Sequence, residues 1–536
     1  MLLPEVIGGL RRWGFRWLTR RRGWTIGRAE VADARRIADA ERAAGAAPAS
    51  CAWLDERTVE DVDLPLVFRA IDRTSTPTGA QALWRWLAAP AFRLGVLAER
   101  ERKLARLAAQ PALRDRIRDA LAGHAASDAP HLPRLLWMPQ PPPPRVARFA
   151  VLPAAVVALA VLAAWWPPLV VFSVALLVAN VWIDDWTSLR LAPQGHALQV
   201  LGQVLGTAEQ VVARGLWHDD TIAADLAAFA GLRKRLAWLT VSDPFGIADL
   251  LRAGLLVRLL LVGRWLRVVD SERARAQRVV LWLGELDALV SIATLRAERA
   301  DARLPQLSTG APRIAAGAIV HPAIANPVGN DVVLDTGVII TGSNMSGKST
   351  FLRTIAINAI CAQSIHTTFG TWRASMFRIH AVMRISDATA EGMSTYAVEV
   401  AAVGALLRVV SQPGHAVPAL FVLDEPFRGT NPALRVPIAV SVLNHLRQRD
   451  LVVAATHDLD VAAQVHARFL RAYFCEPDGD TGHFDHTLRA GVAPTSNAIA
   501  LLARAGYPPM VVAEAERRAR ADPGPARRPR TSDHPG

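Results

Sequence analysis

The chain has few cysteines, and their arrangement excludes two classes of protein. Among 536 residues there are three, Cys51, Cys361 and Cys475, and their spacing matches neither a disulfide framework nor a metal-binding motif. We therefore expect a protein of a reducing cytoplasm. Residues 1–24 contain arginines but no continuous apolar core, so we expect no cleaved signal peptide.

Lysine is also scarce. Lys103, Lys234 and Lys348 are the only lysines, and arginine supplies most of the formal net charge of +13. A basic chain suits nucleic acid and an anionic membrane surface equally well. Few aromatic residues lie among the basic runs, so the sequence predicts no platform for stacking bases. Charge alone therefore leaves DNA binding open.

Charge is absent altogether between Phe149 and Ile183, a run of 35 residues. The sequence Trp-Trp-Pro-Pro at 165–168 divides the run into halves of about 17 to 18 residues, near the lower limit for crossing a bilayer. Tryptophans near the ends of the halves are typical of membrane interfaces. The pattern predicts a transmembrane helical hairpin that anchors the protein in the inner, cytoplasmic membrane with both termini in the cytoplasm. A buried apolar hairpin in a soluble protein is the alternative.

One of the three lysines lies in a phosphate-binding motif. Residues Gly342–Ser349 read G-x-x-x-x-G-K-S, after the apolar strand 338–340 and before a predicted helix that starts near Phe351. The loop's backbone N–H groups and the helix N-terminus favour bound phosphate. We expect Lys348 to reach the β- and γ-phosphates of ATP and Ser349 to hold Mg²⁺. The predicted nucleotide-binding residues of this segment are Gly342, Ser343, Asn344, Met345, Ser346, Gly347, Lys348, Ser349 and Thr350.

Acidic and histidine side chains follow two further apolar strands. The run 420–423 ends in Asp424 and Glu425, and the run 451–455 is followed by Thr456 and His457. An acid at the end of a buried strand can hold Mg²⁺, and a neighbouring acid can position the attacking water. We therefore expect Asp424 to share the metal with Ser349, and we assign Glu425 and His457 to catalysis.

These motifs together resemble the ATPase domain of the MutS family, a branch of the ABC-type ATPases. The family's T-G-P-N-M-G-G-K-S-T, G-x-S-T-F-x-x-E, D-E-I-G-R-G-T-S and A-T-H motifs are similar to residues 341–350, 392–399, 424–431 and 455–457. His321-Pro322, Asn330-Asp331 and segments near residues 72–87, 285–293 and 496–519 are also similar. Ser343, Ser346 and Pro426-Phe427 depart from the family pattern and indicate a divergent branch.

The resemblance implies a two-fold homodimer and a moving lever. In this family a signature segment, which corresponds to residues 392–399 here, reaches across the dimer and completes the ATP site of the partner subunit. The resemblance therefore implies that Ser394 and Thr395 face the γ-phosphate bound by the partner. Mismatch-recognising members begin with a domain that carries a Phe-x-Glu wedge. The only Phe-x-Glu here starts at Phe474, beyond the third ATPase strand, so we expect no direct mismatch recognition.

The predicted fold is an α/β P-loop ATPase domain of ABC type with a mainly parallel sheet, preceded by an all-α lever domain that the transmembrane hairpin interrupts. The predicted segments are a basic leader (1–30), the first helical half (31–138), a proline-rich linker (139–148), the hairpin (149–183), the second helical half (184–300), the ATPase domain (301–520) and a disordered tail (521–536). ATP hydrolysis would move the lever helices, with DNA as an open partner. The alternative is the ATPase of a membrane transporter or a nucleotide-dependent membrane scaffold, although no Leu-Ser-Gly-Gly-Gln signature occurs.

Overall fold

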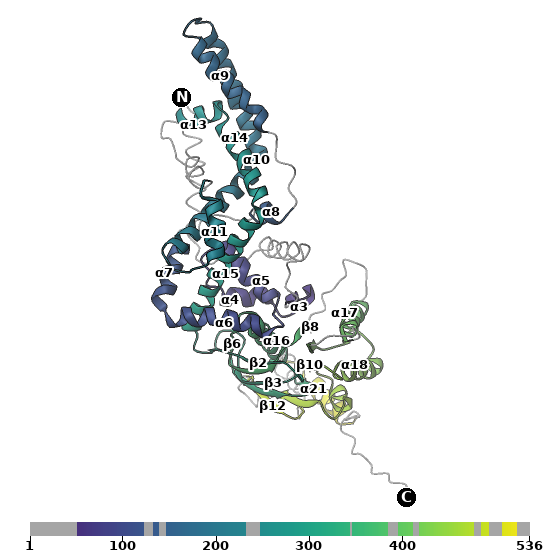
Figure 1. Cartoon of the computed structure of the whole chain (residues 1–536). Helices are drawn as coiled ribbons and strands as arrows, with labels where there is room; N and C mark the ends of the chain where they lie inside the picture. Colours follow the sequence, from purple (N-terminus) through teal and green to yellow (C-terminus); the bar gives the residue numbers. More distant parts are fainter. Residues whose placement is uncertain are drawn as a thin grey trace.

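The computed structural model describes residues 51–122, 132–138, 146–231, 247–343, 346–383, 395–410, 417–475, 484–492 and 506–521. Helices form an elongated stalk that rises from an α/β body, with helix α9 at the far end of the stalk (Figure 1). The predicted leader, the predicted tail beyond Ala521 and most of the proline-rich linker lie outside the described residues.

Most helices of the N-terminal half pack around one long helix, α15 (Arg273–Glu298). The shorter helices here are α3 (Glu56–Asp61), α4 (Leu64–Ile71), α5 (Pro77–Ala88), α6 (Leu94–Ala109), α7 (Pro111–Ala122), α8 (Leu132–Trp137) and α11 (Asp220–Ala228). Helix α3 instead contacts α4 and β8 (Arg378–Val382). Helix α15 approaches α5 closely at Gly284, where a Cβ atom would lie 2.6 Å from the carbonyl oxygen of Thr78. Only glycine permits this contact, so the two helices pack without a side chain between them.

The charge-free run forms a helical hairpin, but the expected pair of membrane spans is not supported. Its first arm consists of the 3₁₀ turn η1 (Val146–Ala150) and α9 (Val151–Leu162), and its second arm opens α10 (Leu169–Ala213). The 12 residues of α9 extend only about 18 Å, whereas a bilayer's hydrocarbon core is about 30 Å thick. Among the described residues one helix, Leu169–Thr187, is long and apolar enough to cross a membrane.

Two helices follow α10 and pack against it near the base of the hairpin. They are α13 (Ile247–Gly254) and α14 (Val257–Ser271). A Cβ atom on Gly254 would lie 2.5 Å from Leu177 of α10, so α13 ends in direct contact with the second arm.

In the described part of the C-terminal half, the strands form three sheets of an α/β body. The main sheet has the order β12-β11-β5-β10-β9-β8, and only β12 is antiparallel to its neighbour. Its strands are β5 (Val338–Thr341), β8 (Arg378–Val382), β9 (Ala419–Asp424), β10 (Leu451–Ala455), β11 (Leu470–Phe474) and β12 (Leu488–Ala490). A second sheet joins β2 (Gln306–Ser308), β7 (Thr371–Ser375), β3 (Ile314–Ile319) and β4 (Asn330–Leu334), and β1 (Ala302–Arg303) pairs with β6 (Thr368–Phe369).

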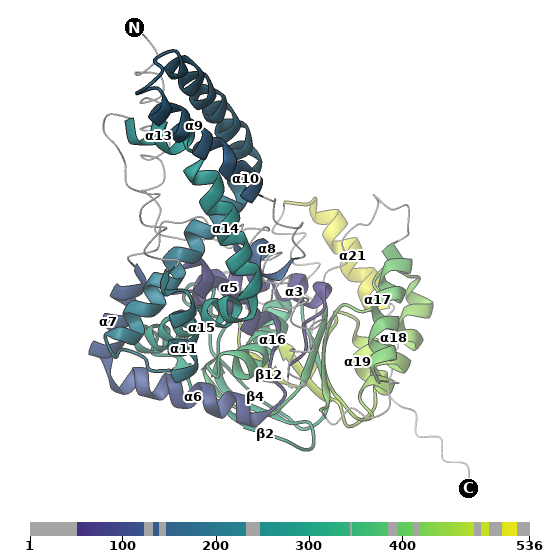
Figure 2. The ribbon, with the colours of Figure 1, turned by 45° about the horizontal axis from the view of Figure 1, so that its top comes forward.

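Both faces of the main sheet are covered, which explains its continuous apolar strands. On one face, Val422 and Val453 join the core that contains α16 (Lys348–Ser364). On the other face, Phe421 and Val452 pack with α17 (Thr395–Val410), α18 (Pro432–Leu446) and α19 (Leu459–Gln464). Figure 2 shows these three helices together on one side of the body. The last described helix is α21 (Pro509–Ala521). The expected α/β domain with a mainly parallel sheet is therefore present.

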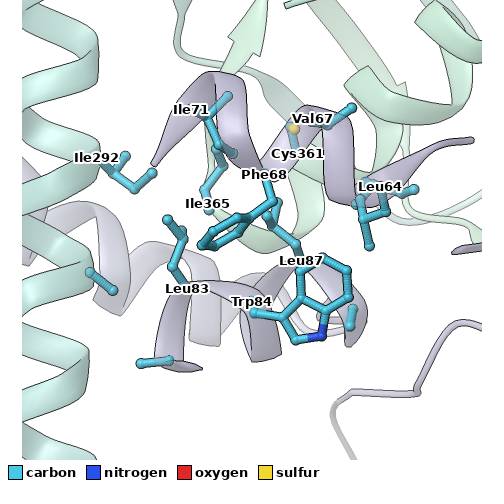
Figure 3. Close-up of a cluster of buried hydrophobic side chains, with 14 of the residues drawn as sticks. Leu64, Val67, Phe68, Ile71, Leu83, Trp84, Leu87, Ile292, Cys361 and Ile365 are labelled. Carbon is cyan, nitrogen blue, oxygen red and sulfur yellow. The ribbon is translucent and has the colours of Figure 1, made fainter. Parts of the chain in front are cut away.

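A shared core joins the stalk to the body (Figure 3). Phe68 of α4 and Trp84 of α5 pack edge to face, with ring centroids 5.8 Å apart. Ile292 of α15 and Cys361 of α16 lie in the same cluster. Complete burial raises the pKa of the Cys361 thiol to about 12, so this cysteine packs as an apolar group.

Polar contacts link α3 to the α/β body, and Asp61 makes two of them. The carboxylate of Asp61 accepts a hydrogen bond from the Met383 N–H (2.9 Å), directly after β8, and its backbone carbonyl accepts one from Arg353 of α16 (2.9 Å). We call this pair of contacts the Asp61 bridge. It ties the stalk to the helix that follows the phosphate loop and to the end of β8.

Candidate functional site

The phosphate loop begins where β5 ends, at the carboxyl edge of the main sheet. Gly342 and Gly347 have φ angles of 139° and 109°, a region that glycine adopts readily and other residues avoid. Gly347 then precedes the first turn of α16. A parallel β-strand, a loop with two such glycines and a helix N-terminus form the arrangement that binds phosphate. Asn344 and Met345, two predicted members of the loop, lie outside the described residues.

Lys348 lies across the loop it belongs to. Its ammonium group donates hydrogen bonds to the carbonyl oxygens of Gly342 (2.6 Å) and Ser343 (2.7 Å), and the residue is 3% exposed. The charge therefore sits inside the curve of the loop, where a phosphate group would bind.

Strands β9 and β10 bring the predicted acids and histidine to the same edge. The Ser349 hydroxyl donates a hydrogen bond to Asp424 Oδ2 at 2.5 Å, although 75 residues separate them. Glu425 has a left-handed backbone (φ 53°), its N–H binds the Ala455 carbonyl (2.9 Å), and its carboxylate contacts His457 Nδ1. The structure thus brings Ser349, Asp424, Glu425 and His457 together in one cluster.

The acids of this cluster have unused acceptor atoms. Among the described residues, Asp424 Oδ1 and Glu425 Oε1 are buried without a hydrogen-bond partner. Burial raises the pKa of Asp424, the hydrogen bond from Ser349 opposes that change, and the charge of Glu425 adds to it. A bound cation would give the unpaired Asp424 Oδ1 a partner. It would also offset the repulsion between the charges of Asp424 and Glu425.

The donor set fits Mg²⁺ bound through few protein ligands. Within the described residues no group of three or more His, Cys, Asp or Glu side chains could hold a metal by itself. Mg²⁺ sites in nucleotide-binding proteins use one or two protein oxygens, with water and phosphate completing the shell. Ser349 and Asp424 supply such oxygens.

A cavity of about 370 Å³ opens beside the phosphate loop. Its apolar wall includes Ile319, Ile324, Phe351 and Phe474, and its lining also contains the following residues: His321, Ala325, Asn326, Pro327, Val328, Asn330, Gly347, Ser349, Thr350, Thr354 and His486. Burial and the positive charge of Arg353 lower the pKa of His321 to about 4, so its imidazole is neutral at physiological pH. An apolar cleft with a few polar groups, next to a phosphate site, suits a heterocyclic base.

His486 is a lining residue that the sequence did not reveal. Its Nδ1 lies 3.1 Å from the Ser346 carbonyl oxygen. The side chain of Asn330 holds the backbone here, because it donates to the His486 carbonyl (3.0 Å) and accepts from the Leu488 N–H (2.7 Å). It lies 140 residues beyond Ser346, with no motif around it. The Asn330-Asp331 pair was the only local signal for this contact.

The structure describes only the second half of the predicted signature segment, residues 395–399. Ser394 lies outside the described residues, and Thr395 is the first residue of α17. Glu399, one turn further along, is 1% exposed and accepts hydrogen bonds from the N–H groups of Arg428 (3.0 Å) and Gly429 (3.2 Å). The start of α17 is therefore fastened to the loop that follows Asp424 and Glu425.

Comparison with known proteins places this geometry in a family. Residues 338–521 match the family model "MutS domain V". Residues 338–521 therefore belong to the MutS family by their match to its domain V. The matched segment runs from β5 through α21 and contains the phosphate loop, Asp424-Glu425 and His457.

Curated members of the MutS family resemble roughly half of this chain. "DNA mismatch repair protein MutS 2" of Halobacterium salinarum is 32% identical over 270 residues, which is 47% of this chain and 30% of that protein. "DNA mismatch repair protein MutS" of Haloquadratum walsbyi is 32% identical over 269 residues (46% and 28%), and "Endonuclease MutS2" of Streptococcus mutans is 29% identical over 259 residues (46% and 32%). The chain therefore spans about 30% of the length of these relatives.

Proposed function

We propose that the α/β body binds ATP with Mg²⁺ and hydrolyses it. The observation that carries this proposal is the cluster at the edge of the main sheet, where the Ser349 hydroxyl meets Asp424 beside the phosphate loop. Lys348 binds the β- and γ-phosphates, and the loop's N–H groups bind the remaining phosphate oxygens. The cavity lined by His321 and His486 takes the adenine base.

Glu425 positions the attacking water through its carboxylate, and His457 orients that carboxylate. Bound Mg²⁺ would neutralise charge that develops on the phosphate oxygens, with Ser349 and Asp424 holding it. The backbone at Glu425 is left-handed, and its side chain contacts His457. Such a conformation is uncommon outside glycine and is often found at functional sites.

ATPase assays on purified full-length variants test this function. We expect Lys348→Ala to weaken ATP binding, and Glu425→Gln to retain binding while slowing turnover by about 10²-fold or more. Lys103→Ala, at an exposed lysine on α6 that pairs with Glu99, is the matched control and leaves both properties unchanged. Wild-type turnover in Glu425→Gln would remove this residue from the mechanism.

The proposed active form is a homodimer in which Ser394 and Thr395 of one subunit face the γ-phosphate in the other. The contact of Glu399 with Gly429 supports this arrangement, because it fixes the helix that starts at Thr395 relative to the catalytic acids. Turnover per subunit should fall on dilution to concentrations at which the protein is monomeric. Unchanged specific activity under those conditions would contradict the composite site.

The proposed output is movement of the stalk, with DNA as the candidate substrate of that movement. Two of the relatives named above are mismatch repair proteins and the third is named an endonuclease, which supports an ATPase coupled to DNA. The test is the ATPase rate with duplex, mismatched and branched DNA. A response to none of these would favour the alternative of a membrane transporter ATPase or a nucleotide-dependent scaffold.

The proposed location is the cytoplasmic face of the inner membrane, with the ATPase body and both termini in the cytoplasm. The support is the apolar hairpin at the end of the stalk, farthest from the nucleotide site (Figure 1). Retention of the protein on membranes through a carbonate wash tests this part separately from catalysis.

A further inference from the structure

The hairpin surface that α13 and α14 leave uncovered is largely apolar. Large apolar side chains that are at least half exposed occur on both arms and at the turn between them. They are Val151, Val157, Val161, Leu162, Trp165, Trp166, Val170, Val171, Phe172, Val174, Val178, Trp182 and Trp186. Only 17% of the window Leu169–Thr187 is buried within the protein, so this is not the core helix of a soluble fold.

Polar side chains of the hairpin point inward. Ser173 is 8% exposed and its hydroxyl donates a hydrogen bond across the hairpin to the Val156 carbonyl oxygen (3.1 Å). Asn180 is fully buried and donates to the Gly254 carbonyl oxygen of α13 (2.8 Å). An exterior without polar groups and an interior that contains them suit a lipid environment.

The turn itself leaves no backbone donor unpaired. The N–H groups of residues 163–166 bond to carbonyls of residues 159–162, and those of residues 169–171 bond to carbonyls of residues 166–168. Pro167 and Pro168 have no N–H to satisfy. A turn exposed to water has no need of this saturation, because water bonds to free N–H groups. In hydrocarbon each unpaired group costs several kcal/mol.

The length of the hairpin sets how deep it reaches. The Val156–Ser173 contact aligns the two arms, and α9 extends about 18 Å from Val151 to the turn. Charged residues bound the arms: Arg148 precedes α9, and the exposed Asp185 follows on α10. With these charges among the lipid headgroups, the turn lies beyond the bilayer midplane but short of the far headgroups of a core about 30 Å thick.

We propose that residues 149–183 enter the bilayer as a re-entrant hairpin, with both arms starting at the cytoplasmic face and the turn 163–168 remaining within the hydrocarbon. This proposal deepens the membrane attachment proposed above and rests on it. Lipid acyl chains are the partner of the exposed apolar surface. Trp182 and Trp186, 71% and 50% exposed near Asp185, lie at the cytoplasmic interface, where tryptophan is favoured.

Site-directed thiols in the full-length protein test the depth. The three native cysteines are first replaced by Cys51→Ser, Cys361→Ala and Cys475→Ser. Single thiols are then introduced by Trp165→Cys at the turn and Trp186→Cys at the interface. Glu99→Cys on the exposed face of α6 is the matched control. The proteins are reconstituted in phosphatidylcholine–phosphatidylglycerol vesicles with the ATPase body outside.

Two readouts are measured on each thiol: labelling by a membrane-impermeant maleimide from outside or trapped inside, and quenching of an attached fluorophore by lipids brominated near the acyl ends. We expect the Trp165→Cys thiol to react on the order of tenfold more slowly than the Glu99→Cys thiol from either side, and to be quenched most. The Trp186→Cys probe should be quenched less, since it lies near the headgroups.

Three results would overturn the proposal, and they have different meanings. Rapid labelling of the turn from the vesicle lumen would show a complete crossing and leave membrane attachment intact. Rapid labelling of the turn from outside on vesicle-bound protein would place the hairpin in water and the attachment elsewhere. Failure to bind vesicles, with the hairpin thiols protected in a dimer, would assign the apolar surface to a second copy of the chain. Normal ATP turnover in all three cases would leave the proposed ATPase function unaffected.

Discussion

Asp287 offers a quantitative test of how α15 is held to the N-terminal helices. Its side chain is completely buried, and it accepts hydrogen bonds from the N–H groups of Ser75 (3.0 Å) and Thr76 (2.8 Å) and from the Thr76 hydroxyl (2.6 Å). Burial raises its pKa to about 6, these hydrogen bonds oppose the rise, and the charge of Asp72 adds to it. Folding therefore changes the proton affinity of this carboxyl group.

The sign of the effect follows from proton linkage. Between pH 3.8, its ordinary pKa, and about pH 6 the folded chain binds more protons at Asp287 than the unfolded chain. Stability is therefore highest below this window, falls as pH rises through it and is constant above it. The difference in pKa corresponds to a change of about 3 kcal/mol in the free energy of unfolding.

We expect Asp287→Asn to remove this pH dependence. The assay is thermal unfolding of wild type and variant in the same detergent, from about pH 4 to pH 7. If the amide introduced at position 287 cannot make one of the hydrogen bonds of Asp287, the Tm of the variant is lowered by an amount that does not depend on pH. The titration adds a further difference in favour of the variant that grows with pH, by roughly 6 to 12 °C for a domain of ordinary size. If the difference in Tm stays constant across the window, Asp287 does not titrate as we infer.

Two further predictions concern the packing of the stalk. Gly79→Ala should destabilise the protein by about 1–3 kcal/mol, because its Cβ atom would lie 2.1 Å from Asp287 Oδ2. Gly95→Ala, in a helix with open space around it, should instead stabilise by up to about 1 kcal/mol. The pair is compared by Tm, and equal effects would refute the close contact. Asp61→Ala should remove the side-chain half of the Asp61 bridge, leave the buried Met383 N–H unpaired at a cost of about 1–3 kcal/mol and lower kcat, while the backbone carbonyl at position 61 still accepts from Arg353. Asp61→Asn retains a side-chain acceptor and stays near wild type. Normal turnover in Asp61→Ala would show that the nucleotide site does not depend on this side-chain contact.

The nucleotide site was largely predictable from the sequence because each of its parts is local. A glycine-rich loop needs its glycines and lysine at fixed spacing, and the strands at 338–341, 419–424 and 451–455 are continuous apolar runs ending in functional residues. Parallel strands buried on both faces place their carboxyl ends at one edge, so Ser349 and Asp424 meet. His486 could not be predicted in the same way. Its approach to the phosphate loop depends on Asn330 and on the antiparallel strand β12, which no local pattern reveals.

For the hairpin, the sequence predicted the element but not the length of its arms. Its lack of charge and its Trp-Trp-Pro-Pro turn predicted a helical hairpin, and that element is present. The expected pair of membrane crossings is not supported, because apolar composition does not determine helix length. The first arm forms only 12 residues of α-helix after a 3₁₀ turn.

The sequence by itself determined the glycine-rich loop, the Asp424-Glu425 pair at the end of its strand and the apolar hairpin, because these features depend on residue type and short-range spacing. Tertiary structure alone decided that Asp287 is buried against the segment containing Thr76, that Asp61 joins the stalk to α16 and β8, and that His486 lines the nucleotide cavity. These contacts join residues about 140 to 320 positions apart, as the hydrogen bonds of His486 and Asp61 show. Bringing such distant residues together costs conformational entropy, and burial of the whole apolar core offsets that cost. Because the stabilisation comes from the core as a whole, no local sequence pattern specifies which residues meet.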